Sequence, residues 1–346
     1  MKEPERIIIV QTAFIGDVIL ITPLIRAVAK LFNKTKIDVL VVNEAAKLLE
    51  NNPYVNEVIV DSKRKNVWQS TVQLIRYIKN RHYNIAITPH SSFRTHLILY
   101  LSKIPERIGF DRGFAKWMLT KKVEHPVGPH KIIKNLGLVK PLSNKEFDIQ
   151  TELFPSANDK HKAEELLKAL SGKTLIAIAP GSIWKTKCWE LNSYISLCRK
   201  LLDSGYGIVL IGGESDKPQC DEIEIAIEKN NANLINLAGV TNLLESAAII
   251  EKCSLMICND SGAMHIANAM QTRVFAFFGP TVPLFGYYPY REGDKVFEVD
   301  LKCRPCGSHG AKKCPLDHHN CMKLIAVEPV LEAVNLLFLR RNNEFN

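Results

Sequence analysis

The sequence predicts an α/β protein built from two open parallel sheets, and three observations support this prediction. Short β-rich runs alternate with helical patterns in the first half, and the same alternation restarts in the second half. The chain has 346 residues, more than one core usually holds at roughly 150 residues per domain. Apolar residues make up 46% and charged residues 23% of it, a composition typical of folded domains.

The first alternation covers residues 7–101 and the second covers residues 159–278. In the first half we expect strands at 7–11, 37–42, 58–60 and 84–88, and helices at 23–32, 67–80 and 94–101. In the second half we expect strands at 174–179, 207–211, 233–236, 255–258 and 274–278, and helices at 159–170, 191–202, 217–228, 243–252 and 263–269. An amphipathic helix is expected at 327–341.

Positive charge is concentrated in the first half. Residues 1–158 hold 24 Lys and Arg against 14 Asp and Glu, a net charge of +10, whereas residues 159–346 hold 21 against 22. A basic half suits a polyanionic partner such as a phosphorylated glycolipid, a nucleic acid or an anionic membrane. A basic solvated surface explains the charge equally well.

The start of the chain offers only the apolar run 7–10, which is too short for a signal peptide. No stretch approaches the roughly 20 apolar residues of a membrane span. We therefore expect a cytoplasmic protein that contacts a membrane surface at most. Its nine cysteines would then be free thiols in a reducing compartment.

Ligands of open α/β sheets bind beyond the carboxyl ends of the strands. The loops expected there are rich in glycine and small polar residues: 12–17, 180–182, 212–216, 259–262 and 279–281. In the loop that opens the helix at 263, Asp260 or Ser261 could cap the helix while free N–H groups bind a phosphate or diphosphate. A plain capped turn is an equally good explanation.

Two further loops carry groups suited to a nucleotide. Lys185 and Lys187 follow Ser182 and could supply mobile positive charge for phosphate, although a solvated basic loop explains either lysine alone. Glu214, after two glycines, could bind a ribose hydroxyl pair. No G-x-G-x-x-G follows a strand anywhere in the chain, which argues against a nicotinamide enzyme.

Asp17 lies after the first strand, at the start of a helix, where a carboxylate could act as a general base. It could equally be an N-cap, the commoner role of an Asp at that place. Among the basic loops of this half, Arg64, Arg94 and Arg112 could bind carboxylates or phosphates of a substrate. For any one of them, scattered surface charge is the simpler explanation.

The tail contains Cys303-x-x-Cys306 followed by Cys314 and Cys321, with histidines between them. The second pair is too widely spaced for the usual zinc pattern, so we favour a structural thiol-rich loop over a zinc site, which stays the alternative. The chain has no Asp-x-Asp, a pair that clamps metal–diphosphate in another fold of sugar-nucleotide transferases. We expect a metal-independent reaction without a cofactor.

Taken in order, these motifs resemble glycosyltransferase family 9, the lipopolysaccharide heptosyltransferases. The resemblance covers nearly the whole chain and rests on the following segments: Gly16-Asp17-Val18 with Thr22-Pro23-Leu24, Pro180-Gly181-Ser182 with Trp184 and Lys187, Gly212-Gly213, 260–267, 278–281, and Cys303-Arg304-Pro305-Cys306 with Cys314 and Cys321. Related enzymes often have Thr and Leu where this chain has Ser261 and Ala263. The tail is more similar to enzymes that add the second heptose.

The resemblance implies a GT-B fold with two facing Rossmann-like domains. Residues 1–158 would bind the acceptor, residues 159–326 the ADP-sugar, and the helix in 327–346 would pack back on the first domain. Asp17 looks like the general base and Lys187 like a catalytic diphosphate contact. The remaining expected site residues are Ser182, Lys185, Glu214, Thr241, Asp260, Ser261, Gly262, Ala263, Met264 and His265 for the donor, and Gly16, Arg64, Arg94 and Arg112 for the acceptor.

The implied activity is inverting transfer of heptose from ADP-heptose to the lipopolysaccharide inner core, onto a Kdo or heptose residue attached to lipid A. We expect a monomer in peripheral contact with the cytoplasmic face of the inner membrane. Two other interpretations stay open: another GT-B transferase or nucleotide-sugar epimerase, and a non-enzymatic polyanion- or RNA-binding protein. No nucleic-acid motif with interleaved aromatic residues is present, so we expect no nucleic acid partner.

Overall fold

The computed structural model describes residues 3–62, 67–227 and 231–344, with side chains up to residue 339. The chain divides into two compact units, Met1–Phe154 and Pro155–Asn346. The division lies four residues before the expected boundary at 158. The reason is that Ser156 is the N-cap of α7 (Ala157–Leu167), where it forms a capping box with Asp159, so these residues start the second unit.

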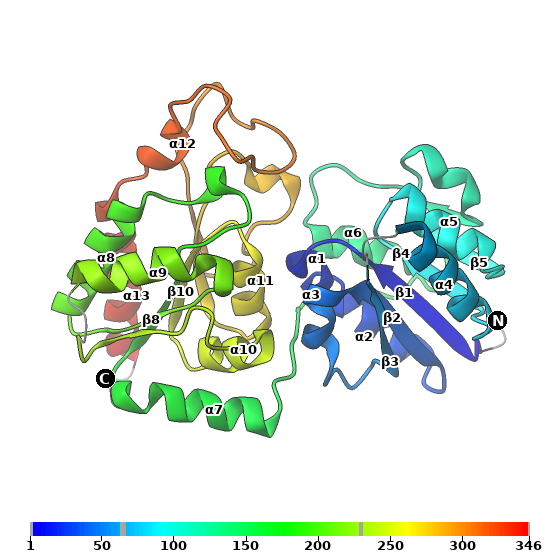
Figure 1. Cartoon of the computed structure of the whole chain (residues 1–346), viewed down its shortest axis with the longest axis horizontal. Helices are drawn as coiled ribbons and strands as arrows, with labels where there is room; N and C mark the ends of the chain where they lie inside the picture. Colours follow the sequence, from blue (N-terminus) through cyan, green and yellow to red (C-terminus); the bar gives the residue numbers. More distant parts are fainter. Residues whose placement is uncertain (1–2, 63–66, 228–230, 345–346) are drawn as a thin grey trace. The chain divides into compact units, whose positions relative to one another are not determined.

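The first unit is a six-stranded parallel sheet in the order β3-β2-β1-β4-β5-β6 (Figure 1). Its strands are β1 (Arg6–Gln11), β2 (Lys36–Val42), β3 (Glu57–Asp61), β4 (Ile85–Thr88), β5 (Glu106–Phe110) and β6 (Lys121–Val123). Its helices are α1 (Ile15–Ile19), α2 (Thr22–Leu31), α3 (Asn43–Ala46), α4 (Val67–Lys79), α5 (Phe93–Leu101) and α6 (Lys131–Gly137), with 3₁₀ turns η1 (Lys47–Leu49) and η2 (Phe114–Met118).

The second unit has its own six-stranded parallel sheet, in the order β12-β11-β10-β7-β8-β9. Its strands are β7 (Leu175–Ala179), β8 (Gly207–Leu210), β9 (Leu234–Asn236), β10 (Leu255–Asn259), β11 (Arg273–Phe277) and β12 (Lys295–Phe297). Besides α7, its helices are α8 (Leu191–Asp203), α9 (Lys217–Ile227), α10 (Leu243–Glu251), α11 (Gly262–Ala269), α12 (Asn320–Lys323) and α13 (Val327–Glu344), with 3₁₀ turns η3 (Lys168–Leu170), η4 (Lys185–Lys187), η5 (Glu214–Asp216) and η6 (Pro283–Phe285).

Each unit therefore has the strand order 3-2-1-4-5-6 of the Rossmann fold, which confirms the expected pair of Rossmann-like sheets. The strand order reverses between β1 and β4 in the first unit, and between β7 and β10 in the second. Such a switch point opens a crevice at the carboxyl ends of the two central strands. The loops after these four strands are the places to examine for a site.

The last helix contributes to the core of the second unit. Three apolar residues of α13, Val330, Ala333 and Val334, are buried in the same core cluster as Leu197 and Leu201 of α8. Their spacing of three and four residues places them on one face of the helix. The described part of α13 thus packs on the core of the second unit.

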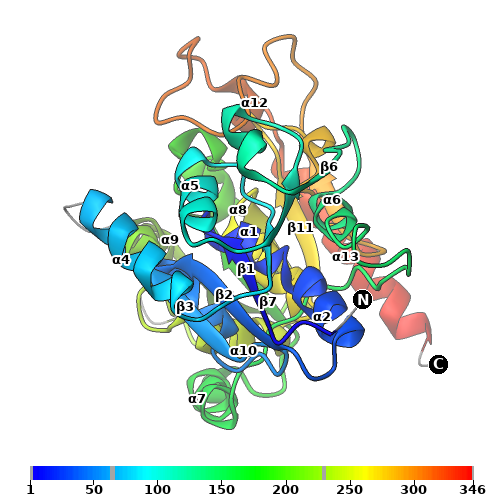
Figure 2. The ribbon, with the colours of Figure 1, turned by 90° about the vertical axis from the view of Figure 1, so that its right-hand side faces the viewer.

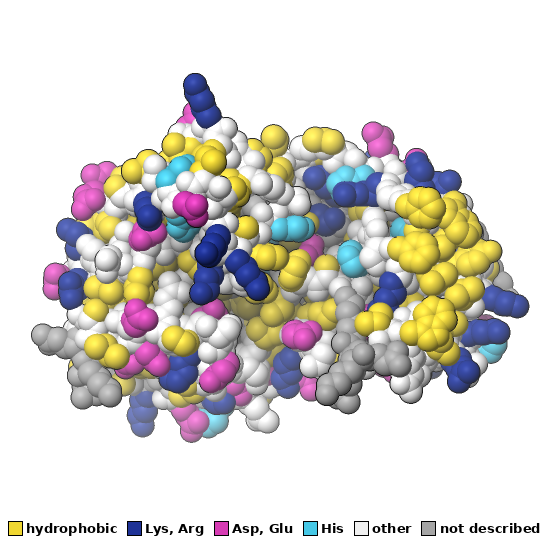
Figure 3. All heavy atoms as spheres, turned by 45° about the horizontal axis from the view of Figure 1, so that its top comes forward, with side chains coloured by type: hydrophobic (Ala, Val, Ile, Leu, Met, Phe, Trp, Pro, Cys, Tyr) yellow, Lys and Arg dark blue, Asp and Glu magenta, His cyan; other side chains and the backbone are white. Residues whose placement is uncertain are grey.

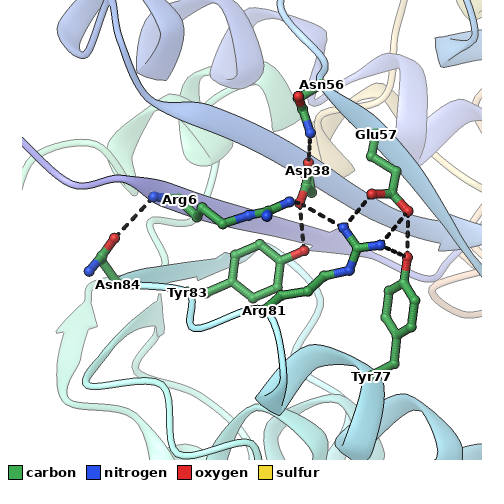
Figure 4. Close-up of polar contacts among 8 residues, drawn as sticks. All are labelled: Arg6, Asp38, Asn56, Glu57, Tyr77, Arg81, Tyr83 and Asn84. Carbon is green, nitrogen blue, oxygen red and sulfur yellow. Dashed lines mark hydrogen bonds and ion pairs between the residues drawn. The ribbon is translucent and has the colours of Figure 1, made fainter.

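A buried ion-pair network lies at the opposite, amino-terminal edge of the first sheet (Figure 4). Asp38 in β2 is fully buried and accepts hydrogen bonds from Arg6 at 2.9 Å, Asn56 at 2.7 Å and Tyr83 at 2.6 Å. Arg81 joins the network through Glu57. Because these groups bind one another at the edge opposite the loops, we interpret the network as structural.

Within the described ranges, no helix is both long enough and apolar enough to cross a membrane.

Candidate active site

A buried ion pair lies at the switch point of the second sheet. The Lys187 ammonium group donates to Asp260 Oδ2 at 2.6 Å, and the Thr281 hydroxyl donates to the same oxygen at 2.7 Å. These three residues come from the loops after β7, β10 and β11. Both side chains of the pair are largely buried, so the lysine is held in place by a partner of the protein itself.

Asn259, the last residue of β10, connects the two central strands. Its amide group donates to the carbonyl of Pro180 at 2.7 Å, and its carbonyl accepts from Trp189 N at 2.9 Å and the Tyr194 hydroxyl at 3.1 Å. The side chain is fully buried. Asn259 therefore fixes the Pro180–Ser182 loop against β10, a positioning role that the sequence alone did not reveal.

The start of α11 has no side-chain cap, which corrects the expectation that Asp260 or Ser261 caps it. Ser261 is at the N-cap position but forms no capping hydrogen bond, and Asp260 is bound to Lys187 and Thr281. Ser261 Oγ is buried and has no hydrogen-bond partner in the described part of the chain. The orphan N–H groups of the first turn and this hydroxyl form a site suited to an oxyanion.

The other expected residues of this loop differ in exposure. Gly262 and Ala263 are half-buried in the first turn of α11. His265 is buried, with its ring 6.4 Å from that of Tyr287. Met264 is fully buried, so its side chain is part of the core and a contact with the donor would be made by its backbone.

The two lysines of the turn η4 differ in exposure and in their partners. Lys185 is exposed, whereas Lys187 points to Asp260. Ser182 is half-buried and accepts a hydrogen bond from Trp184 N at 3.4 Å. Lys185 thus fits the solvated-loop interpretation, and Lys187 does not.

Glu214 and Thr241 lie after β8 and β9, at the same edge of the sheet. Glu214 is exposed, and Thr241 shares a hydrogen bond of 2.7 Å with the Ser246 hydroxyl. A backbone hydrogen bond of 3.0 Å from Gly239 to Gly212 joins the two loops. Glu214 is therefore accessible for a ribose, while the Thr241 hydroxyl already has a partner.

The cysteine-rich tail covers the turn η4. The Thr186 hydroxyl donates to the carbonyl of Ala311 at 2.9 Å and accepts from its N–H at 2.8 Å, and His319 Nε2 contacts the Thr186 carbonyl at 2.8 Å. The tail thus supports the turn that carries Lys187. Sequence spacing could not reveal this contact, because more than 120 residues separate the partners.

The four tail cysteines, Cys303, Cys306, Cys314 and Cys321, are free thiols. Burial raises the pKa of Cys321 to about 11, so this thiol is protonated at neutral pH. Among the residues that the structure describes, no group of three or more His, Cys, Asp or Glu side chains is arranged to hold a metal ion.

In the first unit, the expected base Asp17 lies in α1, directly after β1. The N-cap of α1 is Phe14, so Asp17 is the third helical residue and the N-cap alternative is wrong. Asp17 is half-buried, and Gly16 beside it is buried. The negative charge of Asp17 favours the charged form of Lys131 in α6, which indicates that the two groups are close.

Lys131 lies in a cluster with two further cations, Arg112 and Lys134, and with His125. Arg112 lies 3.2 Å from His125 Nε2, and the Lys131 ammonium lies over the Phe110 ring at 5.5 Å. Burial is the largest cause that lowers the pKa of each lysine, and the Arg112 charge lowers it further. Burial and the neighbouring cations lower the pKa of His125 to about 4.

Both lysines of this cluster are buried, and in the ranges covered by the structure neither forms an ion pair. Burying a cation without an ion-pair partner is costly, so the cluster is suited to an anionic ligand. Arg112 was expected in the site from the sequence, whereas Lys131 and Lys134 were not.

The other expected acceptor cations do not join this cluster. The Arg94 guanidinium forms an ion pair with the buried Asp61 and hydrogen bonds to Thr71 and Ser70, so it is occupied within the first unit rather than free for an acceptor. Arg64 lies outside the described residues.

Comparison with known proteins identifies the family. The model of glycosyltransferase family 9 (heptosyltransferase) matches residues 71–316. Lipopolysaccharide heptosyltransferase 2 of Escherichia coli is 26% identical over 97% of this chain and 99% of its own length. Lipooligosaccharide heptosyltransferase 2 of Campylobacter jejuni is 24% identical over 94% of this chain and 96% of its own length.

A solved structure agrees with these matches. The E. coli ADP-heptose lipopolysaccharide heptosyltransferase II has a TM-score of 0.80 and 25% identity to this chain, covering 97% of it and 99% of that structure. The family match spans well over half of the chain. The chain therefore belongs to glycosyltransferase family 9, the heptosyltransferase family, and is a glycosyltransferase.

Proposed function

We propose that this enzyme transfers a heptose from ADP-L-glycero-D-manno-heptose to the inner core of lipopolysaccharide, as the second heptose added. Relatives named heptosyltransferase 2 match nearly the full chain, which supports the choice of sugar and step. The observation that carries the chemistry is the Lys187–Asp260 pair beside the uncapped start of α11.

The second unit is suited to the departing diphosphate. Lys187, the first-turn N–H groups of α11 and the Ser261 hydroxyl come from loops at one switch point. Fixed positive potential where negative charge develops contributes most to many enzymatic reactions. ADP needs little help from a general acid, because the second pKa of a phosphate is about 6 and ADP therefore leaves as a stable anion. With charge stabilisation from these groups, we propose a reaction that needs no metal ion.

The first unit is suited to the acceptor. Lys131, Lys134 and Arg112 would bind the carboxylates or phosphates of the inner core. Asp17 would accept the proton of the attacking hydroxyl while that oxygen bonds to the anomeric carbon and the bond to ADP breaks. Attack from the face opposite ADP inverts the anomeric centre.

We further propose that the enzyme acts as a monomer, without a nucleic acid partner, at the cytoplasmic face of the inner membrane, where a lipid-anchored acceptor is present.

The experiment is incubation of the protein with ADP-heptose and lipopolysaccharides truncated before the first or the second heptose, read by mass spectrometry. We expect a gain of one heptose only on the acceptor that already carries one. A gain only on the heptose-free acceptor would contradict the proposed step. Interconversion of a UDP-sugar without acceptor, or salt-sensitive RNA binding without sugar turnover, would contradict the proposed activity.

A further inference from the structure

A large apolar surface lies on the first unit (Figure 3). We name it the aromatic face, and it consists of Phe93, Tyr100 and Leu101 of α5 together with Phe114 and Trp117 of η2. All five side chains are exposed, Phe114 to 86% and Trp117 to 57%. Contiguous exposed apolar surface of this kind marks an interaction site.

The five side chains are held side by side by the fold. Positions 93, 100 and 101 recur on one face of α5, and the Tyr100 and Trp117 rings meet edge-to-face at 5.6 Å. A Cβ atom on Gly113 would lie 3.6 Å from the Ser91 carbonyl, so the residues that precede Phe93 and Phe114 are close. The helices α4 and α5 lie side by side in both ribbon views (Figures 1 and 2).

The exposed rings stand on a rigid base. Ala115 and Met118 of η2 are buried, as are Ile98 and Leu99 of α5. Each element therefore contributes one apolar face to the core of the first unit and turns a second apolar face outward. The outward apolar face therefore belongs to the folded state, because the elements that carry it are well packed.

Positive charge surrounds the aromatic face. Residues 93–122 carry seven Lys and Arg against two Asp and Glu, a net charge of +5. Lys103 lies two residues after α5, and Lys122 lies in the edge strand β6. Lys116, between Phe114 and Trp117 in the sequence, forms an ion pair of 2.9 Å with Asp111, and all three lysines are exposed. Lysines of this kind attract anionic lipid headgroups.

We propose that the aromatic face docks on an anionic phospholipid surface, with the rings of Trp117, Tyr100 and Phe114 at headgroup level and the lysines on lipid phosphates. Trp and Tyr favour the membrane–water interface, because their rings are amphipathic. The net positive charge of residues 93–122 favours an anionic lipid surface as the partner, because such a surface is negatively charged over its whole area. The inference rests on the proposed function, in which the acceptor is anchored in a membrane by lipid A.

The test is flotation of the full chain with vesicles of phosphatidylcholine alone or with about 30% phosphatidylglycerol. We expect binding to the anionic vesicles that weakens as salt is added. The double variant Phe114→Ser/Trp117→Ser should bind about tenfold or more weakly, and Lys103→Gln about fivefold more weakly. The matched control is Ile225→Ser/Leu284→Ser, which removes two exposed apolar side chains of the second unit and should bind like wild type.

Equal binding to neutral vesicles, or unchanged binding by the double variant, would overturn the proposal. Sedimentation of the wild type as a dimer and of the double variant as a monomer would also overturn it, because the face would then contact a second copy of the chain. A lipid-free acceptor separates the two proposals: the double variant should glycosylate it at the wild-type rate. If the wild type floats with vesicles but transfers no heptose, the proposed function fails and the docking surface stands.

Discussion

The two units hold their buried lysines in opposite ways. In the second unit, Lys187 is paired with Asp260 at 2.6 Å, so its charge is compensated before any ligand binds. In the first unit, Lys131 and Lys134 are buried beside Arg112, and burial lowers their pKa values. The second unit thus fixes a cation in position, whereas the buried lysines of the first unit have no ion-pair partner in the described residues, which fits the proposal that an anionic acceptor binds there.

The largest expected effect comes from Asp17, the carboxylate near Lys131. Asp17→Asn should lower kcat by about 10²–10⁴-fold, because a positioned general base contributes that much, and should leave ADP affinity unchanged. Steady-state kinetics and calorimetric titration of ADP measure the two. Asp148→Asn, an exposed carboxylate of the same unit, is the control; if Asp17→Asn kept full turnover, Asp17 would not be the base.

Lys187→Ala is expected to have the next largest effect. It removes a fixed cation and leaves Asp260 buried without its ion-pair partner, so kcat should fall by about 10²–10³-fold and the KM for ADP-heptose should rise. Lys185→Ala removes an exposed lysine of the same turn and should change both values little. Equal effects of Lys187→Ala and Lys185→Ala would contradict the prediction that the paired lysine contributes to the reaction and the exposed one does not.

Lys134→Met should weaken acceptor binding and stabilise the fold. The KM for the acceptor should rise about tenfold or more, as expected for loss of a charged hydrogen bond. Because burial and Arg112 lower the pKa of Lys134, its charged form is less favourable in the folded than in the unfolded protein at neutral pH. Thermal unfolding should therefore occur at a higher temperature; a lower one would contradict the comparison. Lys140→Met, at an exposed lysine, should change neither.

Thr186→Val should have the smallest effect on turnover. It removes both hydrogen bonds of the Thr186 hydroxyl to Ala311, at a cost of about 1–3 kcal/mol in the free energy of unfolding. The turn carrying Lys187 should loosen, with a several-fold loss of kcat/KM for ADP-heptose. Ser204→Ala removes an exposed hydroxyl and is the control. A stability loss with unchanged kcat/KM would show that the tail does not position Lys187.

Much of the fold could be predicted from the sequence, because apolar residues recur at regular spacing along the longer strands and helices. The strands missed were β5, β6 and β12, among which the edge strands β6 (Lys121–Val123) and β12 (Lys295–Phe297) have three residues each and start with lysine. Short, charged edge strands carry almost no apolar pattern, because they face solvent and oppose edge-to-edge pairing.

The site was predicted less completely than the fold. The expected loops do lie after β1, β7, β8, β10 and β11, since parallel strands place their loops at one edge. The sequence could not predict the ion pair between Lys187 and Asp260, because 73 residues separate them. Lys131 and Lys134 look like a solvated helix face, because spacing does not reveal whether a lysine is buried. Each unit buries lysines near its loops, and only the structure shows that Lys187 is paired with a carboxylate.

One measurement tests this account most directly: both KM values, for ADP-heptose and for the truncated acceptor, in Lys134→Met and in Lys187→Met. We expect a crossed result. Lys134→Met should raise the KM for the acceptor and leave that for ADP-heptose unchanged, and Lys187→Met should raise the KM for ADP-heptose and leave that for the acceptor unchanged. If either variant raised both values equally, the division of donor and acceptor between the two units would be contradicted.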